Sequence, residues 1–170
     1  MRLFLALMPP PELRERLGSL ADAAHARCGG RRMPDESLHL TLAFLGEVEP
    51  AKATELAAWV QDLAIQPGEW RPDSWGSFRR PGIIWIGGQE PDLALERLQG
   101  KVWDTLEPLG LGPAPARFIP HVTLLRRAAR LCLEELPQVK LTWPYQRIEL
   151  IHSITDENGA CYRSLAVSAL

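Results

Sequence analysis

The sequence predicts an α+β fold built on antiparallel β-sheet. Its expected elements follow the order strand, helix, strand, helix, strands, helix, strands, which differs from the regular alternation of a doubly wound parallel sheet. Asn158-Gly159, between two strand-like segments, is a typical hairpin turn sequence. The chain contains neither GxGxxG nor GxxxxGKS/T, so the common nucleotide-binding loops of parallel folds are not supported.

Proline, glycine and the spacing of apolar residues mark the individual elements. Pro11 suits the first position of a helix, and Gly29-Gly30 suits its end. Leu95 and Leu98 belong to an apolar stripe with helical spacing. In chain order we expect a strand over 2–8, a helix over 12–27, a strand over 38–45, a helix from Pro50 to Pro67, strands over 70–78 and 83–86, a helix over 93–109, and strands over 121–125, 147–154 and 162–167.

Length and charge restrict the function classes. A chain of 170 residues with 46% hydrophobic residues suits one compact domain or two small, tightly packed lobes. The net charge of -2 lacks the basic excess of proteins that coat a duplex. A nucleic acid partner would therefore be a terminus or a short strand that is held locally.

Cysteine usage and the amino terminus indicate a cellular compartment. Cys28, Cys132 and Cys161 are an odd number without CxxC spacing, which argues against a disulfide framework or a structural zinc site. The apolar run over residues 1–8 is too short for a signal peptide, and no stretch approaches the length of a membrane span. We expect a cytoplasmic monomer with no membrane role.

Two short segments of the sequence resemble each other and carry the candidate chemistry. They are Leu38-His-Leu-Thr-Leu42 and Pro120-His-Val-Thr-Leu124. Because side chains on a strand alternate between its faces, the histidine and threonine of each segment share one face, and the aliphatic residues share the other. One such pair is usually structural, but two pairs in the same phase predict a cleft with four polar groups. The predicted catalytic residues are His39, Thr41, His121 and Thr123.

The segments His39–Gly46 and Phe118–Arg126 resemble the two signature motifs of the 2H phosphoesterase superfamily. Within it, the chain is most similar to RNA 2',3'-cyclic phosphodiesterases, historically called 2'-5' RNA ligases. The resemblance extends over nearly the whole chain. It implies two pseudo-symmetric lobes of antiparallel sheet with outer helices, which flank a central cleft and form one bilobal domain over residues 1–170.

Two histidines suit the opening of a cyclic phosphate. A neutral imidazole accepts the proton of the attacking water, and an imidazolium protonates the leaving oxygen. The threonine hydroxyls donate to nonbridging oxygens, so no metal or cofactor is needed. The resemblance further implies that His121 activates water and that His39 protonates the ribose 3' oxygen, which leaves a 2'-phosphate. The expected substrates are RNA ends or nucleotides with a 2',3'-cyclic phosphate.

Three residues near the motifs have two interpretations each. Arg126 resembles a family position that contacts phosphate, and it is equally consistent with a solvated surface arginine. Phe118 either stacks on a base or packs into the cleft wall. Phe44 lies off the His39 face by strict alternation, which favours core packing.

Three alternative functions remain open. The first is RNA end joining through a 2'-5' linkage, which is the same chemistry in reverse. The second is a non-catalytic module that binds RNA ends, and two intact His-x-Thr pairs argue against it. The third is a metallohydrolase, which is disfavoured because no Asp, Glu or Cys stands at ligand spacing from His39 or His121.

Overall fold

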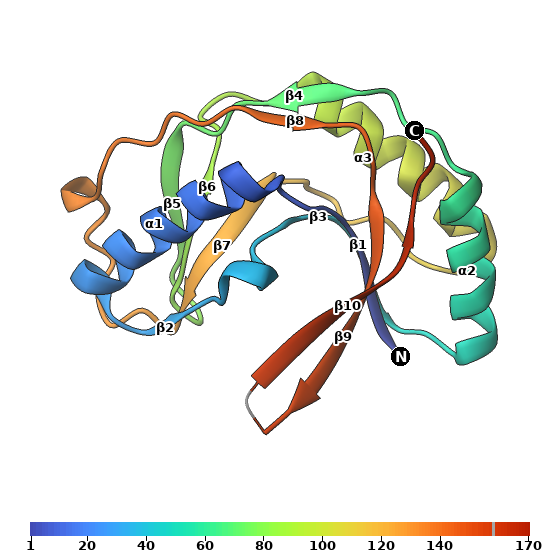
Figure 1. Ribbon diagram of the computed structural model, residues 1–170, viewed down its shortest axis with the longest axis horizontal. Coiled ribbons are helices and arrows are strands. Elements are labelled where there is room, and N and C mark those ends of the chain that lie inside the picture. The colour runs from blue at the N-terminus through green and yellow to red at the C-terminus, as the bar shows by residue number, and fades with distance from the viewer. Residues whose placement is uncertain (158) are drawn as a thin grey trace.

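Two four-stranded antiparallel sheets organise the computed structural model, which describes residues 1–157 and 159–170 (Figure 1). The first sheet has the order β10-β9-β1-β3 and the second has the order β2-β7-β6-β5. The first comprises β1 (Arg2–Leu7), β3 (Leu40–Glu47), β9 (Glu149–Asp156) and β10 (Gly159–Val167). The second comprises β2 (Arg31–Arg32), β5 (Ser74–Phe78), β6 (Ile83–Gly87) and β7 (His121–Arg126). The predicted α+β class with two lobes of antiparallel sheet is confirmed.

Three helices cover the outer sides of these sheets. Helix α1 (Pro11–Cys28) packs on β7 of the second sheet, whereas α2 (Pro50–Asp62) and α3 (Leu93–Leu106) pack on the first. In Figure 1 α1 accordingly lies beside β5, β6 and β7, and α2 and α3 lie at the opposite side of the molecule. Short 3-10 turns span Asp35–Ser37, Glu107–Leu109 and Leu133–Glu135. None of the helices in the described part of the chain has the length and apolar character needed to cross a membrane.

Helix boundaries follow the expected local signals at most positions. Pro11 and Pro50 occupy the first turns of α1 and α2, where a missing backbone N–H leaves no bond unmade. Gly29 ends α1 with a φ of 68°, a conformation that a Cβ would strain. Asp92 caps α3, because its side chain accepts a hydrogen bond of 3.0 Å from the backbone N–H of Leu95.

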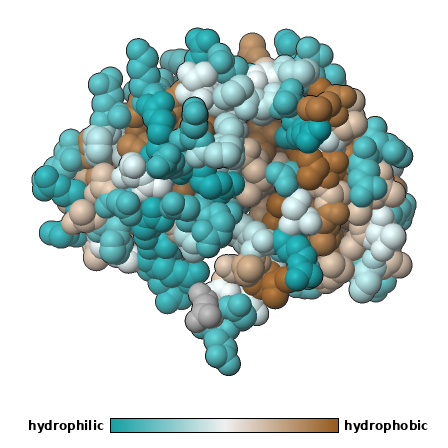
Figure 2. Space-filling view, in the orientation of Figure 1, coloured by the Kyte–Doolittle hydropathy of each residue, from teal (hydrophilic) through white to brown (hydrophobic). Residues whose placement is uncertain are grey.

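The hydrophobic core lies between sheets and helices and includes one face of each His-x-Thr strand. Leu40 and Leu42 on β3 are at most 2% exposed, and Val122 and Leu124 on β7 are fully buried. These side chains join one continuous cluster with residues of all three helices. Figure 2 shows a more hydrophobic surface over the half of the molecule that carries α2 than over the half that carries α1.

The structure corrects the sequence prediction in two places. The strand expected over residues 70–78 is two strands in different sheets: β4 (Gly68–Trp70) pairs with β8 (Trp143–Tyr145), and β5 begins at Ser74. Pro72 lies in the break, where it donates no backbone hydrogen bond. Helix α2 ends at Asp62 rather than near Pro67, and Ala64 instead forms a β-bridge with Ala169.

The expected hairpin turn involves Asn158, which lies outside the described residues. The strands on either side of it, β9 and β10, pair in antiparallel fashion from Asp156↔Gly159 onward. In Figure 1 this hairpin extends away from the rest of the first sheet.

Candidate active site

A central cleft of about 450 Å³ brings the two His-x-Thr pairs together. One pair lies at the start of β3, an edge strand of the first sheet, and the other lies on β7 of the second sheet. Strands β3 and β7 approach each other at this point, so the predicted four residues meet across the cleft. Its other walls come from β1, β2, β9 and β10. The predicted residues that line it are His39, Thr41, His121, Thr123 and Arg126.

His39 is held at both ring nitrogens. Its Nδ1 lies 2.7 Å from the carbonyl oxygen of Ser37, and its Nε2 lies 2.8 Å from the Thr41 hydroxyl oxygen. A carbonyl oxygen only accepts hydrogen bonds, so Nδ1 carries the proton in the neutral ring. The Nε2 nitrogen then accepts from the Thr41 hydroxyl and is the position that exchanges a proton.

His121 repeats this arrangement on the opposite strand. Its Nδ1 donates to the carbonyl oxygen of Ile119 at 2.6 Å, which is again the residue two positions earlier. The neutral tautomer is therefore the same at both histidines, with Nε2 as the available base. The two motifs thus share a backbone contact as well as residue types.

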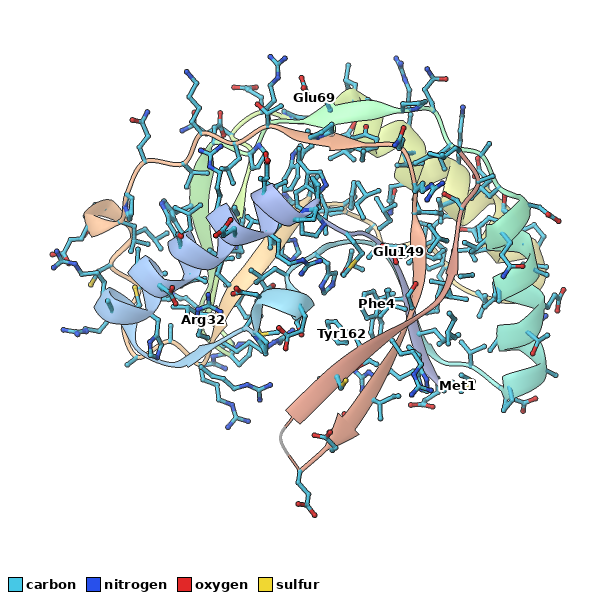
Figure 3. All side chains as sticks on the ribbon, viewed as in Figure 1. Met1, Phe4, Arg32, Glu69, Glu149 and Tyr162 are labelled. Atoms are coloured by element: carbon cyan, nitrogen blue, oxygen red, sulfur yellow. The ribbon has the colours of Figure 1, made fainter. Side chains whose placement is uncertain are left out.

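Aromatic rings flank both imidazoles. Phe4 stacks on His39 with ring centroids 4.7 Å apart, and Tyr162 meets His39 edge-on at 5.4 Å. Figure 3 shows Phe4 and Tyr162 together where β10 crosses β1. Phe78 and Trp85 lie 5.4 and 5.6 Å from the His121 ring. Sequence reasoning did not assign these four rings to the site, because they come from strands far from the motifs in the chain.

Burial is the main cause of the lowered pKa of both histidines. It lowers the pKa of His39 to about 4, against a smaller raising effect of the Ser37 carbonyl. His121 and the cations Arg126 and Arg14 lower this pKa further. Burial also lowers the pKa of His121, the Ile119 carbonyl opposes the shift, and Arg126 adds to it. Without an anion in the cleft, both rings are therefore neutral at pH 7.

Three arginines give the cleft its positive charge. Arg2, Arg31 and Arg126 line it, and in the described part of the chain none of them forms an ion pair with a carboxylate. Guanidinium groups bind phosphate oxygens with two parallel hydrogen bonds. The cleft thus combines neutral imidazoles with unpaired cations, an arrangement that favours an anionic ligand.

Phe44 does not pack in the core as expected, since it is 52% exposed and lines the cleft. The pairing of β3 with β1 shows the reason: Thr41 pairs with Ala6, but Ala43 pairs with Leu5, which leaves one extra residue on β3. This irregularity reverses the alternation, so that the cleft face changes from odd to even positions. Arg2 lies 5.2 Å over the Phe44 ring.

Phe118 lies outside the central cleft, in an adjoining aromatic groove of about 460 Å³. The groove also contains Phe78 and shares Thr41, Phe44 and His121 with the cleft. Phe118 is partly buried and packs against the main core. The two histidines therefore stand where a cationic cleft and an apolar groove meet.

Metal ligands do not gather in this region. Among residues 1–157 and 159–170, no group of three or more His, Cys, Asp or Glu side chains is placed to hold a metal ion. The two histidines direct their Nδ1 atoms to backbone carbonyls, and no carboxylate is among the described residues that line the cleft.

Comparison with known proteins places the chain among phosphoesterases. The sequence model of the LigT-like phosphoesterases matches residues 7–85. An RNA 2',3'-cyclic phosphodiesterase of Escherichia coli is 32% identical, with 85% of this chain and 81% of that protein covered. One from Aeropyrum pernix is 30% identical, with 88% and 92% covered. The crystal structure of Escherichia coli LigT complexed with 3'-AMP superposes with a TM-score of 0.83 at 27% identity, covering 99% and 97% of the two chains.

The lowered pKa of His39 predicts a loss of stability in acid. An unfolded histidine has a pKa near 6.5, so below that pH the unfolded state gains a proton that the folded cleft resists down to about pH 4. His39 therefore contributes full stability above pH 6.5 and loses it as the pH falls to 4, by at most about 3 kcal/mol. We expect the free energies of unfolding of wild type and His39→Gln, measured in urea at each pH from 7 to 4, to converge or cross as the pH falls. Parallel curves would contradict a neutral, buried His39.

Proposed function

The chain belongs to the LigT-like phosphoesterases of the 2H superfamily and is an enzyme, and we propose that it hydrolyses 2',3'-cyclic phosphates at RNA ends or on nucleotides to 2'-phosphomonoesters. The observation that carries this proposal is the meeting of two histidines in one cationic cleft. Each donates its Nδ1–H to a backbone carbonyl, which leaves Nε2 as the nitrogen that exchanges a proton.

The two Nε2 atoms supply a base and an acid. In the proposed reaction, neutral His121 accepts a proton from water as the water oxygen attacks phosphorus. The bond from phosphorus to the ribose 3' oxygen breaks, and protonated His39 gives its Nε2 proton to that oxygen. The assignment of base and acid follows the family resemblance. The greater burial of His39 supports it, because a proton placed there leaves readily.

Substrate binding prepares His39 for this role. An anion near an imidazole favours the protonated form, which raises a pKa that burial has lowered. A cyclic phosphate diester carries one negative charge, and the unpaired cations Arg2, Arg31 and Arg126 attract it. His39 is thereby protonated when substrate occupies the cleft. The bell-shaped pH profile expected for an acid and a base should therefore be seen in kcat, which reports the pKa values of the enzyme–substrate complex.

The hydroxyl groups and Arg126 are proposed to stabilise the phosphate. Thr41 and Thr123 line the cleft two residues after their histidines. The Thr123 hydroxyl donates to a nonbridging oxygen, and the Thr41 hydroxyl does so once protonation of His39 Nε2 releases the hydrogen bond that Thr41 otherwise donates to that nitrogen. Such donors and the arginines provide the charge stabilisation that a metal ion gives in other phosphoesterases. We infer that the enzyme needs no metal.

A nucleobase is proposed to occupy the aromatic groove. Phe44, Phe78 and Phe118 line it directly beside the His121 ring. Stacking on aromatic side chains tolerates every base, which suits a protein that acts on RNA ends of varied sequence. The 3'-AMP bound by Escherichia coli LigT shows that a similar structure holds a nucleotide.

The reaction itself is tested with 2',3'-cyclic AMP and with an oligonucleotide that ends in a cyclic phosphate, both in excess EDTA. We expect full turnover, and chromatography against standards should identify 2'-phosphates as the products. Loss of activity in EDTA with recovery on addition of zinc or manganese would reject the metal-independent mechanism. Binding of these substrates without turnover, both in EDTA and with added metal, would favour a non-catalytic module that binds RNA ends.

Both histidines are expected to be essential. His39→Ala and His121→Ala should each lower kcat by about 10²–10⁴-fold, which is the usual contribution of general acid or base catalysis. The double variant should lose little more, because the two groups act in one step. Thr41→Ala and Thr123→Ala should lose less, and His25→Ala on the surface of α1 is the control. Normal turnover by a folded His39→Ala or His121→Ala protein would refute the assignment.

Arg126 is expected to bind the negatively charged phosphate group of the substrate. Arg126→Ala should lower kcat/KM by about 10- to 100-fold, which corresponds to loss of a hydrogen bond to a charged group. Arg130→Ala removes the same charge from the surface outside the cleft and should have little effect. Equal losses in the two variants, measured in steady-state kinetics, would indicate general electrostatic attraction rather than a specific contact.

A further inference from the structure

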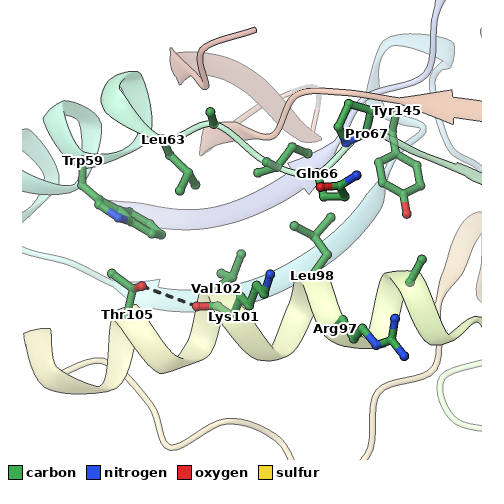
Figure 4. A pocket seen from close by; sticks show the side chains of 13 residues that line it. Trp59, Leu63, Gln66, Pro67, Arg97, Leu98, Lys101, Val102, Thr105 and Tyr145 are labelled. Carbon is green, nitrogen blue, oxygen red and sulfur yellow. Dashed lines mark hydrogen bonds between the residues drawn. The ribbon is translucent and has the colours of Figure 1, made fainter.

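A second pocket lies between α2 and α3 and has a volume of about 510 Å³ (Figure 4). This α2–α3 pocket shares no lining residue with the central cleft or the aromatic groove. Its volume falls within the roughly 300–1,000 Å³ typical of small-molecule sites. Its walls include Trp59 on α2, Leu63 just after α2, Leu98, Lys101 and Val102 on α3, and Tyr145 on β8.

Apolar side chains from two helices face each other across this pocket. Leu98 and Val102 are one turn apart on α3, and both are less than 10% exposed. Trp59 on α2 and Leu63, the residue that follows the last residue of α2, lie opposite them (Figure 4). Such surfaces hold an apolar ligand body through the hydrophobic effect.

Two cationic side chains line the pocket. Arg97 and Lys101 line it one turn apart on α3, and no Asp or Glu is among the lining residues. Within the described part of the chain, neither cation takes part in an ion pair. Like charges at this spacing destabilise a helix slightly, and an anion between them reverses that effect.

A tyrosine hydroxyl group also faces the pocket. Tyr145 is 7% exposed, and its hydroxyl forms no hydrogen bond with any described residue. Figure 4 shows the phenol ring directed from β8 toward α3, across the end of the pocket. The hydroxyl oxygen is open to solvent, so it is able to donate a hydrogen bond to a ligand in the pocket.

From these contacts we propose that the α2–α3 pocket binds a small amphipathic organic anion. Its apolar body lies on Trp59, Leu98 and Val102. Its single carboxylate, sulfonate or phosphate group faces Lys101 and Arg97, and the Tyr145 hydroxyl donates to a polar atom. This assignment is independent of the chemistry in the central cleft.

The test uses 8-anilinonaphthalene-1-sulfonate, which has an apolar aromatic body and one negative charge. We expect saturable fluorescence with one dye bound per chain. Lys101→Glu should weaken binding by about tenfold, because charge reversal replaces attraction by repulsion. Lys140→Glu, which makes the same change of charge at an exposed site outside the pocket, should bind normally.

A second pair of variants tests whether the dye binds in the α2–α3 pocket, by filling the pocket with a large side chain. Ala94→Trp places an indole at the mouth of the pocket and should abolish saturable binding, whereas Ala58→Trp on the exposed face of α2 should not. Both alanines are exposed, so folding is expected to persist, and circular dichroism checks this. Displacement of the dye by inorganic phosphate, or equal binding by Ala94→Trp and Ala58→Trp, would overturn the proposal.

Discussion

The alternation of side chains along β3 and β7 is the constraint on which the rest of the site depends. Leu40 and Val122 are fully buried, and their neighbours Thr41 and Thr123 line the cleft. Every aliphatic residue that anchors one of these strands in the core therefore fixes the position of a polar residue on its other face. The core beneath the site thus fixes its geometry, which is the condition for placing the proposed acid and base on opposite sides of one phosphate.

The backbone just before each strand adds the second constraint. Ser37 and Ile119 each offer a carbonyl oxygen to the Nδ1–H of the histidine two residues later. This contact fixes the tautomer and the ring orientation without any carboxylate near the phosphate site. An acidic partner in that position would stabilise the imidazolium, but it would also repel an anionic substrate. A carbonyl oxygen orients the ring without bringing a full negative charge.

The helices and the alternation of each His-x-Thr strand could be predicted because they depend on patterns within about twenty residues. The α+β class followed from the order of the elements, and the meeting of the four His/Thr residues in one cleft followed from the likeness of two short segments. The remainder depends on contacts that are distant in the chain. No local pattern distinguishes β4 from β5, since their separation follows from pairing with β8 and β6. Strict alternation placed Phe44 in the core because the irregular pairing of β3 is visible only beside β1. For the same reason Tyr162, some 120 positions after His39 in the printed sequence, could not be assigned to its ring.

The two halves of the cleft match in their backbone contacts but differ in their surroundings. The His39 ring is bonded to Thr41, stacked on Phe4 and covered by Tyr162, and its pKa falls to about 4. His121 has aromatic neighbours as well, yet it also borders the aromatic groove that opens beside Phe118. A base that activates water needs access to solvent, whereas the proposed acid must first gain a proton, which a bound anion favours. The asymmetry of burial thus distinguishes two chemically identical side chains, as the proposed division of roles requires.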